Sequence, residues 1–176
     1  AKVSMGVINP LKVIITNLSD DHLEYVDAEN HPKDESFGTR KVPFTKTVYI
    51  EREDFIEEKP NKKWKRLAGG IEVRLRHAYF IKCNEIIKNY NGIILEIHAT
   101  YDPETKSGSW FNERKPNGTI HWLSATESTP AEFRIINPLI VDTDFDRKDF
   151  LDHINPNSME IKHGFVEMGM MEEENE

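Results

Sequence analysis

Alternation of apolar and polar residues with a period of two is the feature that most restricts how this chain folds. In residues 71–76, "IEVRLR", every second side chain is apolar, and the pattern recurs in residues 93–101, "IILEIHATY". Shorter runs behave similarly in residues 44–51, "FTKTVYIE", and residues 131–136, "AEFRII". Because successive side chains of a β-strand point to opposite faces, this spacing predicts strands with one buried face.

Turn signals separate these runs. Asn91-Gly92, the strongest short signal for a hairpin, stands between residues 78–90, "AYFIKCNEIIKNY", and the predicted strand in residues 93–101. Asn117-Gly118 precedes "TIHWL" in the same manner. The sequence therefore predicts a hairpin at each of these two positions.

Helical patterns are scarce. Residues 146–154, "DRKDFLDHI", are the best helix candidate, and a weaker turn is predicted in residues 54–59, "DFIEEK". Many short strands between turns predict an all-β fold with few short helices, built as small antiparallel β-barrels or as a sandwich. A length of 176 residues suits one ordinary domain or two small ones.

The composition places the chain among globular proteins in water, with 38% hydrophobic and 31% charged residues. No stretch approaches the roughly 18 consecutive apolar residues of a transmembrane helix. Residues 1–10 lack the apolar core of a secretory signal peptide. The single cysteine, Cys83, excludes an intrachain disulfide and a cysteine-based zinc cluster. These features predict a cytoplasmic protein with no membrane partner.

No metal site is expected. Residues 142–146 carry aspartates at alternate positions, as a calcium loop does. Arg147 stands where that loop needs glycine, and His153 stands where it needs glutamate, so an acidic helix start is the better interpretation. His98 and His121 lie outside any ligand-spaced cluster and are interpreted as packed or surface residues.

Signatures of catalysis are absent as well. The chain has no phosphate loop, nucleophile elbow or dinucleotide fingerprint. We therefore expect neither catalytic residues nor a cofactor in this chain.

A basic stretch, residues 62–76 ("KKWKRLAGGIEVRLR"), stands out in a chain whose formal net charge is −8. It carries a formal charge of +5, which leaves −13 on the other residues. An acidic protein does not attract nucleic acid by its net charge, so any such contact must come from a local patch of this kind.

The residue types of the basic stretch suit RNA. Arg74 and Arg76 share one strand face about 7 Å apart, and planar guanidiniums bind phosphates or base edges. Trp64 offers a ring for stacking on an unpaired base. The remaining candidates are Lys62, Lys63, Lys65 and Arg66. The alternative is a solvated strand face, with Trp64 capping the end of a barrel.

Several long motifs resemble one family. They are "VINPLKVIITN", "GTRKVPFTKTVYIEREDF", "KRLAGGIEVRLRHAYFIKC", "IHATYDPETKSG" and "GTIHWLSA". Their order and spacing are similar to those of the C-terminal anticodon-binding region of bacterial-type glutaminyl-tRNA synthetases. The resemblance runs from Val7 to about Phe165. It implies tandem ribosomal-protein-like anticodon-binding β-barrels, here taken as residues 1–125 and a C-terminally incomplete second barrel in residues 126–176.

The resemblance also implies roles for individual residues. Arg66, in "KRL", and Arg74, the first arginine of "EVRLR", correspond to arginines that read anticodon bases in the family. Lys65 and Arg76 would support them, and Arg40, in "GTRKVPF", is a weaker candidate. Unpaired loop bases can be splayed out and read along their hydrogen-bonding edges, which fits these assignments.

The implied partner is the anticodon stem-loop of glutamine tRNA, with no DNA. The implied parent is a monomeric class I ligase that joins glutamine to its tRNA with ATP and Mg²⁺. Signatures of its catalytic domain are missing from this chain, so the chain itself does not activate glutamine.

Two departures from the family concern the middle anticodon base. Val3 stands where the family usually has an arginine, and the later strands of the second barrel are missing. Three alternatives remain open: the related barrels of a glutamyl-tRNA synthetase, a free-standing barrel that binds ribosomal RNA, and a protein-interaction barrel with an acidic partner.

Overall fold

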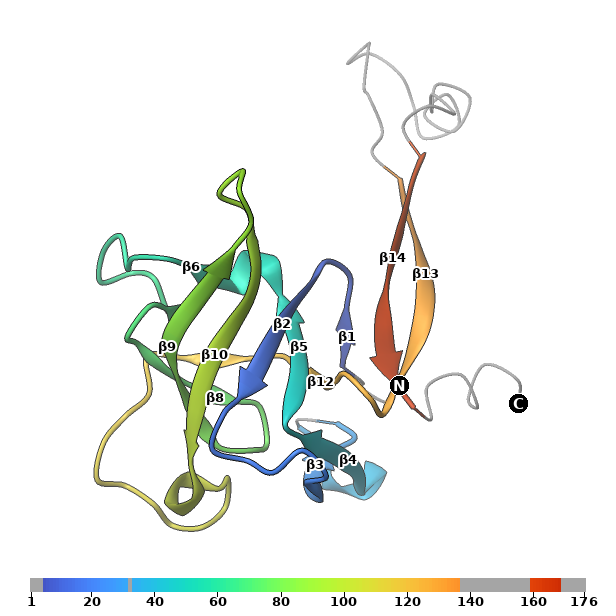
Figure 1. Ribbon diagram of the computed structural model, residues 1–176. Coiled ribbons are helices and arrows are strands. Elements are labelled where there is room, and N and C mark those ends of the chain that lie inside the picture. The colour runs from blue at the N-terminus through green and yellow to red at the C-terminus, as the bar shows by residue number, and fades with distance from the viewer. Residues whose placement is uncertain (1–4, 32, 137–158, 169–176) are drawn as a thin grey trace, which may run out of the picture.

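Strands make up most of the chain in the computed structural model, which describes residues 5–31, 33–136 and 159–168 (Figure 1). The helices of this part are three single 3-10 turns: η1 (Glu35–Phe37), η2 (Arg52–Asp54) and η3 (Pro103–Thr105). The all-β prediction is confirmed. The helix predicted in residues 146–154 lies outside the described residues.

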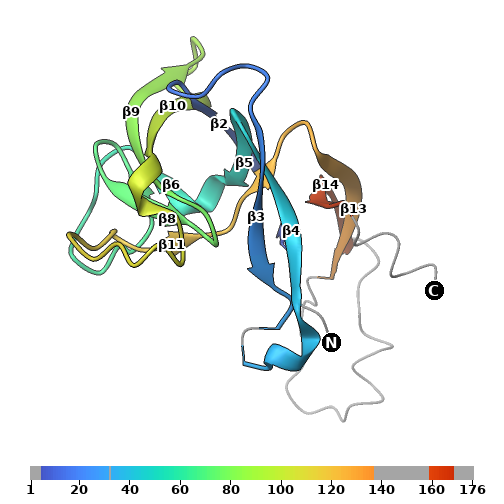
Figure 2. The same cartoon turned by 90° about the horizontal axis from the view of Figure 1, so that it is seen from below.

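A seven-stranded sheet forms the larger part of the molecule. Its strands lie in the order β11–β8–β9–β10–β2–β5–β12, and the sheet curls round on itself (Figure 2). Antiparallel pairs dominate, but β10 and β2 pair in parallel, as do β11 and β8. The bounds are β2 (Pro10–Ile15), β5 (Thr47–Glu51), β8 (Glu72–Leu75), β9 (Phe80–Lys88), β10 (Ile94–Asp102), β11 (Thr119–Ile120) and β12 (Leu123–Ser124).

The predicted hairpin at Asn91-Gly92 is confirmed, because it joins β9 to β10. Gly92 has a φ of 80°, and the Oδ1 atom of Asn89 accepts hydrogen bonds from the N–H groups of Asn91 and Ile93. The register then shifts between Ile94 and Glu96. This irregularity leaves Leu95 half exposed, although the simple alternation groups it with the buried Ile97 and Ala99.

The hairpin predicted at Asn117-Gly118 does not form. The strand that follows, β11, pairs in parallel with β8 rather than antiparallel with the strand before the turn. The Nδ2 atom of Asn117 instead donates to the carbonyl oxygens of Trp64 and Arg66, at 2.9 Å each. A Cβ on Gly118 would lie 1.7 Å from the carbonyl oxygen of Lys65, so glycine is needed for close backbone contact.

Two smaller pairs flank the large sheet. Strands β3 (Leu23–Glu29) and β4 (Thr39–Thr45) form a hairpin that projects from the curled sheet (Figure 2). Strands β6 (Phe55–Ile56) and β7 (Leu67–Ala68) pair in parallel just before the basic stretch enters β8.

A second sheet contains β1 (Gly6–Val7), β14 (Met159–Glu167) and β13 (Ser128–Ile136), in that order. The hairpin of β13 and β14 stands beside the large sheet (Figure 1). Tyr49 of β5 stacks on Phe165 of β14, with 4.7 Å between ring centroids. Because β1 joins β14, the first described residues belong to this second sheet, and the division at residues 125 and 126 stays a prediction.

The core lies inside the curl of the large sheet. Trp122 and Phe44 are fully buried and meet edge to face, with 5.6 Å between ring centroids. The alternating residues of β8 behave as predicted, since Val73 and Leu75 are fully buried in this core. The other face of β8 is thereby left to its charged residues. No helix in the described part of the chain is long and apolar enough to cross a membrane.

Candidate nucleic-acid interface

The basic stretch reaches the large sheet through a tight backbone contact. The N–H group of Gly69 donates to the carbonyl oxygen of Glu57 at 3.2 Å, and a Cβ on Gly69 would lie 2.6 Å from the same oxygen. Glycine at position 69 therefore lets the chain's own backbone come close, where β6 and β7 pair.

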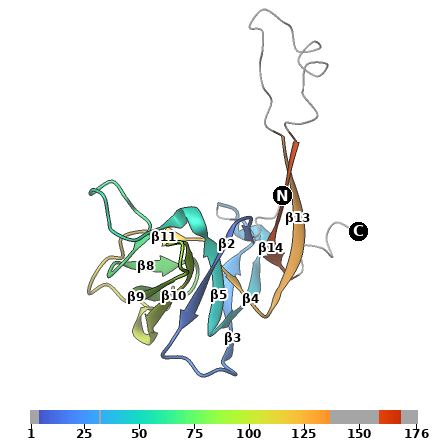
Figure 3. The same cartoon turned by 45° about the horizontal axis from the view of Figure 1, so that its top comes forward.

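Strand β11 extends the sheet beyond β8 (Figure 3). The N–H group of Arg74 donates to the carbonyl oxygen of Gly118 at 2.9 Å, and that of Arg76 donates to the carbonyl oxygen of Ile120 at 3.0 Å. This pairing brings residues 118–121 alongside the basic stretch.

A pocket of about 340 Å³ opens at this junction. Three cations, Lys65, Arg66 and Arg76, line it together with Asp54 and residues 118–121. Its lining is therefore mostly positive, in a chain whose net charge is negative. We refer to it as the basic pocket.

Arg66 is held at the basic pocket by a single acidic partner. Its Nη1 atom donates to Oδ1 of Asp54, a residue at the end of η2 that is buried. About half of the Arg66 side chain, 55%, stays exposed. The guanidinium is thus oriented from one side and open to solvent on the other.

Arg76 supplies an unsatisfied donor. Its Nε atom is buried and has no hydrogen-bond partner among the described residues, while its backbone carbonyl accepts from Nε1 of Trp122 at 2.7 Å. A buried donor without a partner costs free energy. His121 lies beside it, and partial desolvation together with the charge of Arg76 lowers the pKa of His121, which keeps its ring neutral at pH 7.

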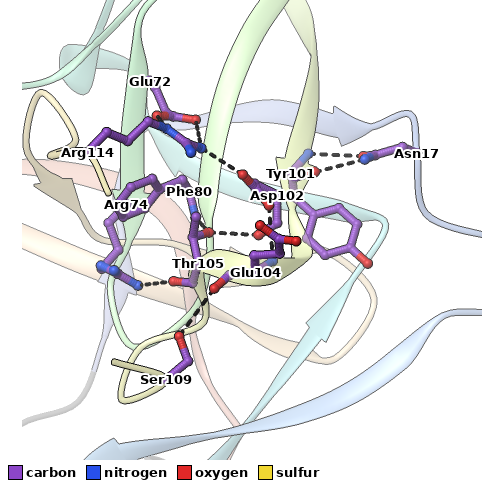
Figure 4. A network of polar contacts seen from close by, with 10 residues as sticks. All are labelled: Asn17, Glu72, Arg74, Phe80, Tyr101, Asp102, Glu104, Thr105, Ser109 and Arg114. Atoms are coloured by element: carbon purple, nitrogen blue, oxygen red, sulfur yellow. Dashed lines mark hydrogen bonds and ion pairs between the residues drawn. The ribbon is translucent and has the colours of Figure 1, made fainter. Parts of the chain in front are cut away.

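Arg74 is engaged within the protein, as Figure 4 shows in part. Its Nη1 atom donates to the carbonyl oxygens of Ala78, at 2.8 Å, and Thr105, at 2.7 Å. Its Cζ atom lies 4.5 Å from the centroid of the Phe80 ring, a cation–π contact. Burial lowers the pKa of the Arg74 guanidinium, although an arginine stays charged at any ordinary pH.

The comparisons with known proteins identify the family. Residues 1–102 match the anticodon-binding domain of class I tRNA synthetases (E and Q), and residues 119–176 match a second model of the same description. The chain belongs to this family. Its motifs, its barrel-like sheet and its focused positive charge therefore describe an anticodon-binding region of class I synthetases.

Curated relatives agree with this assignment. The glutamine–tRNA ligase of Clostridium perfringens is 57% identical over 166 residues, which are 93% of this chain and 30% of that protein. The glutamine–tRNA ligase of Clostridioides difficile is 54% identical over 95% of this chain and 30% of its own length. The glutamine–tRNA ligase of Psychromonas ingrahamii is 51% identical over 95% of this chain and 30% of its own length. The chain thus spans about 30% of the length of these relatives.

The anticodon-binding region brings some of the predicted site residues together and separates others. Lys65, Arg66 and Arg76 share the basic pocket. Arg74, in β8, is absent from this lining and donates instead to the carbonyl oxygens of Ala78 and Thr105. Arg40 forms a bidentate ion pair with Glu167 of β14, at 2.9 Å for each bond, and so links β4 to the second sheet.

The other candidates lie in the loop that leads into β7. Lys62 and Lys63 are exposed there, next to the turn that Asn61 makes through its side chain. Trp64 is half-buried, and its Nε1 atom donates to the carbonyl oxygen of Leu67 at 3.1 Å. This placement agrees with the alternative interpretation, in which Trp64 caps the end of a barrel.

Sequence reasoning missed two residues of the basic pocket. Asp54 lies 12 residues before its partner Arg66, in a segment that carried no signal beyond a weak turn. His121 was considered only as a metal ligand with His98. The structure places His98 next to Glu85 and Glu96 instead. Among the described residues, no group of three His, Cys, Asp or Glu side chains is placed to hold a metal ion.

Proposed function

We propose that this chain binds the anticodon stem-loop of glutamine tRNA and that the basic pocket reads one of its unpaired bases. The observation that carries the proposal is the pocket itself, where Lys65, Arg66 and Arg76 meet in a chain of net charge −8. A volume of about 340 Å³ falls within the range of pockets that hold small planar groups. Guanidinium N–H groups match the acceptor atoms along a base edge.

Each cation has a distinct part in this proposal. Arg66, oriented by Asp54, and Arg76 donate to the base from the lining of the basic pocket. Lys65 neutralises the adjoining phosphate, and the exposed Lys62 and Lys63 contact the backbone without reading sequence.

Arg74 is a pre-oriented reader at the other edge of β8. The Ala78 and Thr105 carbonyls take both hydrogens of its Nη1 atom, which leaves the hydrogens of Nε and Nη2 for a second base. The family role of Arg40 stays a proposal, because its Nε and Nη2 atoms already bind Glu167. Trp64 likewise keeps only its half-exposed ring for stacking.

We infer that the parent polypeptide is a glutamine–tRNA ligase. The relatives that support this carry that name and are about three times as long as this chain. Ligation with ATP and Mg²⁺ would take place in parts of the parent that this chain does not include. We further propose that the parent is monomeric and acts in the cytoplasm.

The test is a binding measurement over a salt series. The chain is titrated with a stem-loop that carries the glutamine anticodon and with one in which the third anticodon base is changed. Clear preference for the glutamine anticodon supports base reading. Salt-sensitive binding without preference contradicts it and leaves a surface that only grips the RNA backbone. The absence of RNA binding would favour a protein-interaction barrel.

A further inference from the structure

Trp110 is the most exposed tryptophan of the chain, with 95% of its surface accessible. It lies in the segment between η3 and β11, and its backbone has a φ of 67°. Left-handed backbone is unfavourable for a bulky residue and persists only where the surroundings enforce it. An exposed indole on such a backbone therefore needs an explanation.

The neighbours of Trp110 are anchored on both sides. Before it, the Ser109 hydroxyl donates to the Glu104 carbonyl at 3.3 Å (Figure 4). After it, the Phe111 ring packs edge to face on Phe80, with 5.7 Å between centroids. The backbone at Trp110 is thus fixed while its side chain stays free of the core.

The same anchors connect the segment of Trp110 to the surroundings of Arg74. Phe80 carries the Arg74 guanidinium at 4.5 Å and packs against Phe111. Thr105, in the turn that starts this segment, accepts the second hydrogen bond of Arg74. The segment that carries Trp110 is therefore anchored to the same residues that hold Arg74.

The other two tryptophans are used differently. Trp122 is fully buried, and Trp64 is half-buried, and each donates its Nε1 hydrogen to a backbone carbonyl. The Nε1 atom of Trp110 has no hydrogen-bond partner within the described ranges. Its ring contributes little to the fold and is open to a ligand.

We propose that Trp110 is a stacking platform for an unpaired base of the RNA loop that Arg74 contacts. This inference rests on the proposed function and adds a residue to it. An exposed indole can stack on an unpaired base, and every base offers a face to it. Arg74 would bind the edge or the phosphate of the same nucleotide.

The test compares Trp110→Ala and Trp110→Phe with the wild-type chain in binding to the glutamine-anticodon stem-loop. Alanine should weaken binding by about fivefold to a hundredfold, and phenylalanine should restore most of it. Stacking releases no counterions, so the loss should be equal at low and high salt. Tyr90→Ala is the matched control, because Tyr90 is fully exposed at the opposite end of the β9–β10 hairpin. This variant should bind the stem-loop as tightly as the wild type does.

Two results overturn the inference while leaving the proposed function intact. One is unchanged binding by Trp110→Ala when the wild type still prefers the glutamine anticodon. The other is an equal loss in both Trp110 variants together with a lower unfolding temperature, which would make the residue structural. If the wild type binds no RNA, the inference and the proposed function fall together.

Discussion

At the scale of the residue, Arg74 and Arg76 differ although the strand pattern makes them equivalent. Arg74 lies in β8 on the face that points away from the core, and Arg76 follows directly after β8 ends at Leu75. Arg74 donates to two carbonyl oxygens, whereas the Nε atom of Arg76 has no partner in the described structure. Arg74 is therefore held in place by the fold through Nη1, whereas no hydrogen bond holds the Nε atom of Arg76.

This difference predicts that two matched substitutions change the free energy of unfolding by different amounts. Arg74→Ala should lower the free energy of unfolding by about 1–3 kcal/mol, because it leaves the Ala78 and Thr105 carbonyls without their charged donor. Arg76→Ala removes an unpaired donor and should change stability by less than about 0.5 kcal/mol, while it weakens binding of the stem-loop. Urea unfolding of both variants checks the prediction, and equal losses of stability would contradict it.

At the scale of the element, Arg114 fastens the segment between η3 and β11 to the large sheet. It donates to both carboxylate oxygens of Glu72, at 2.7 and 2.8 Å, and to Asp102 at 2.8 Å (Figure 4). Its Cζ atom also lies 5.1 Å from the centroid of the Phe111 ring. One side chain thus connects β8, β10 and the segment that carries Trp110.

A pH dependence of stability follows from this connection. The hydrogen bond from Arg114, and then the one from the N–H group of Glu104, lower the pKa of Asp102 from its ordinary 3.8. Because the folded-state pKa is the lower one, the unfolded chain binds more protons in acid, and stability rises with pH through this window. The contribution is complete above the ordinary pKa and is lost as the pH falls through the folded-state pKa.

Arg114→Gln tests this dependence. The difference in free energy of unfolding between wild type and variant should be constant from about pH 7 to about pH 5 and should shrink below about pH 4. Denaturant unfolding over this range provides the measurement. A difference that stays the same at every pH would show that Asp102 does not depend on Arg114.

The elements also show what the sequence predicts and what it does not. Alternation and Asn91-Gly92 correctly predict β8, β9, β10 and the hairpin between the last two, because both signals are local. Asn117-Gly118 misleads, since a two-residue turn signal does not say which strand the next one joins.

The candidate site follows the same division. Lys65, Arg66 and Arg76 are close in sequence and do share a pocket, as their common stretch predicts. Arg74 donates to the carbonyl oxygen of Thr105, which lies 31 residues away in the sequence, and no local sequence pattern predicts that hydrogen bond. Only the folded chain shows which arginines are already engaged.

At the scale of the whole molecule, an acidic protein gathers three of its cations, Lys65, Arg66 and Arg76, around one pocket at an edge of the curled sheet. The surrounding negative charge repels RNA elsewhere, so the basic pocket is where the backbone of an RNA loop is expected to dock. Arg40 does not add to this positive charge, because its ion pair with Glu167 neutralises it. The same ion pair connects β4 to β14 of the second sheet.

Lys62→Ala tests this electrostatic account. Lys62 is exposed before the pocket and is expected to meet a phosphate. Its removal should weaken the binding of all stem-loops alike. It should also make the slope of log affinity against log salt concentration shallower by about 0.7. Lys12→Ala, at an exposed lysine in the middle of the large sheet, is the control and should leave the slope unchanged. An unaltered slope for Lys62→Ala would remove this lysine from the contact surface.

The most direct test of the basic pocket as a reader of bases is the anticodon preference of Arg66→Ala. Affinities of wild type and variant are measured for the glutamine-anticodon stem-loop and for loops changed at each anticodon position. We expect the variant to lose about 1–3 kcal/mol on the glutamine anticodon and to discriminate less at one position only. An equal loss on every loop would contradict base reading and reduce Arg66 to a contact with the backbone.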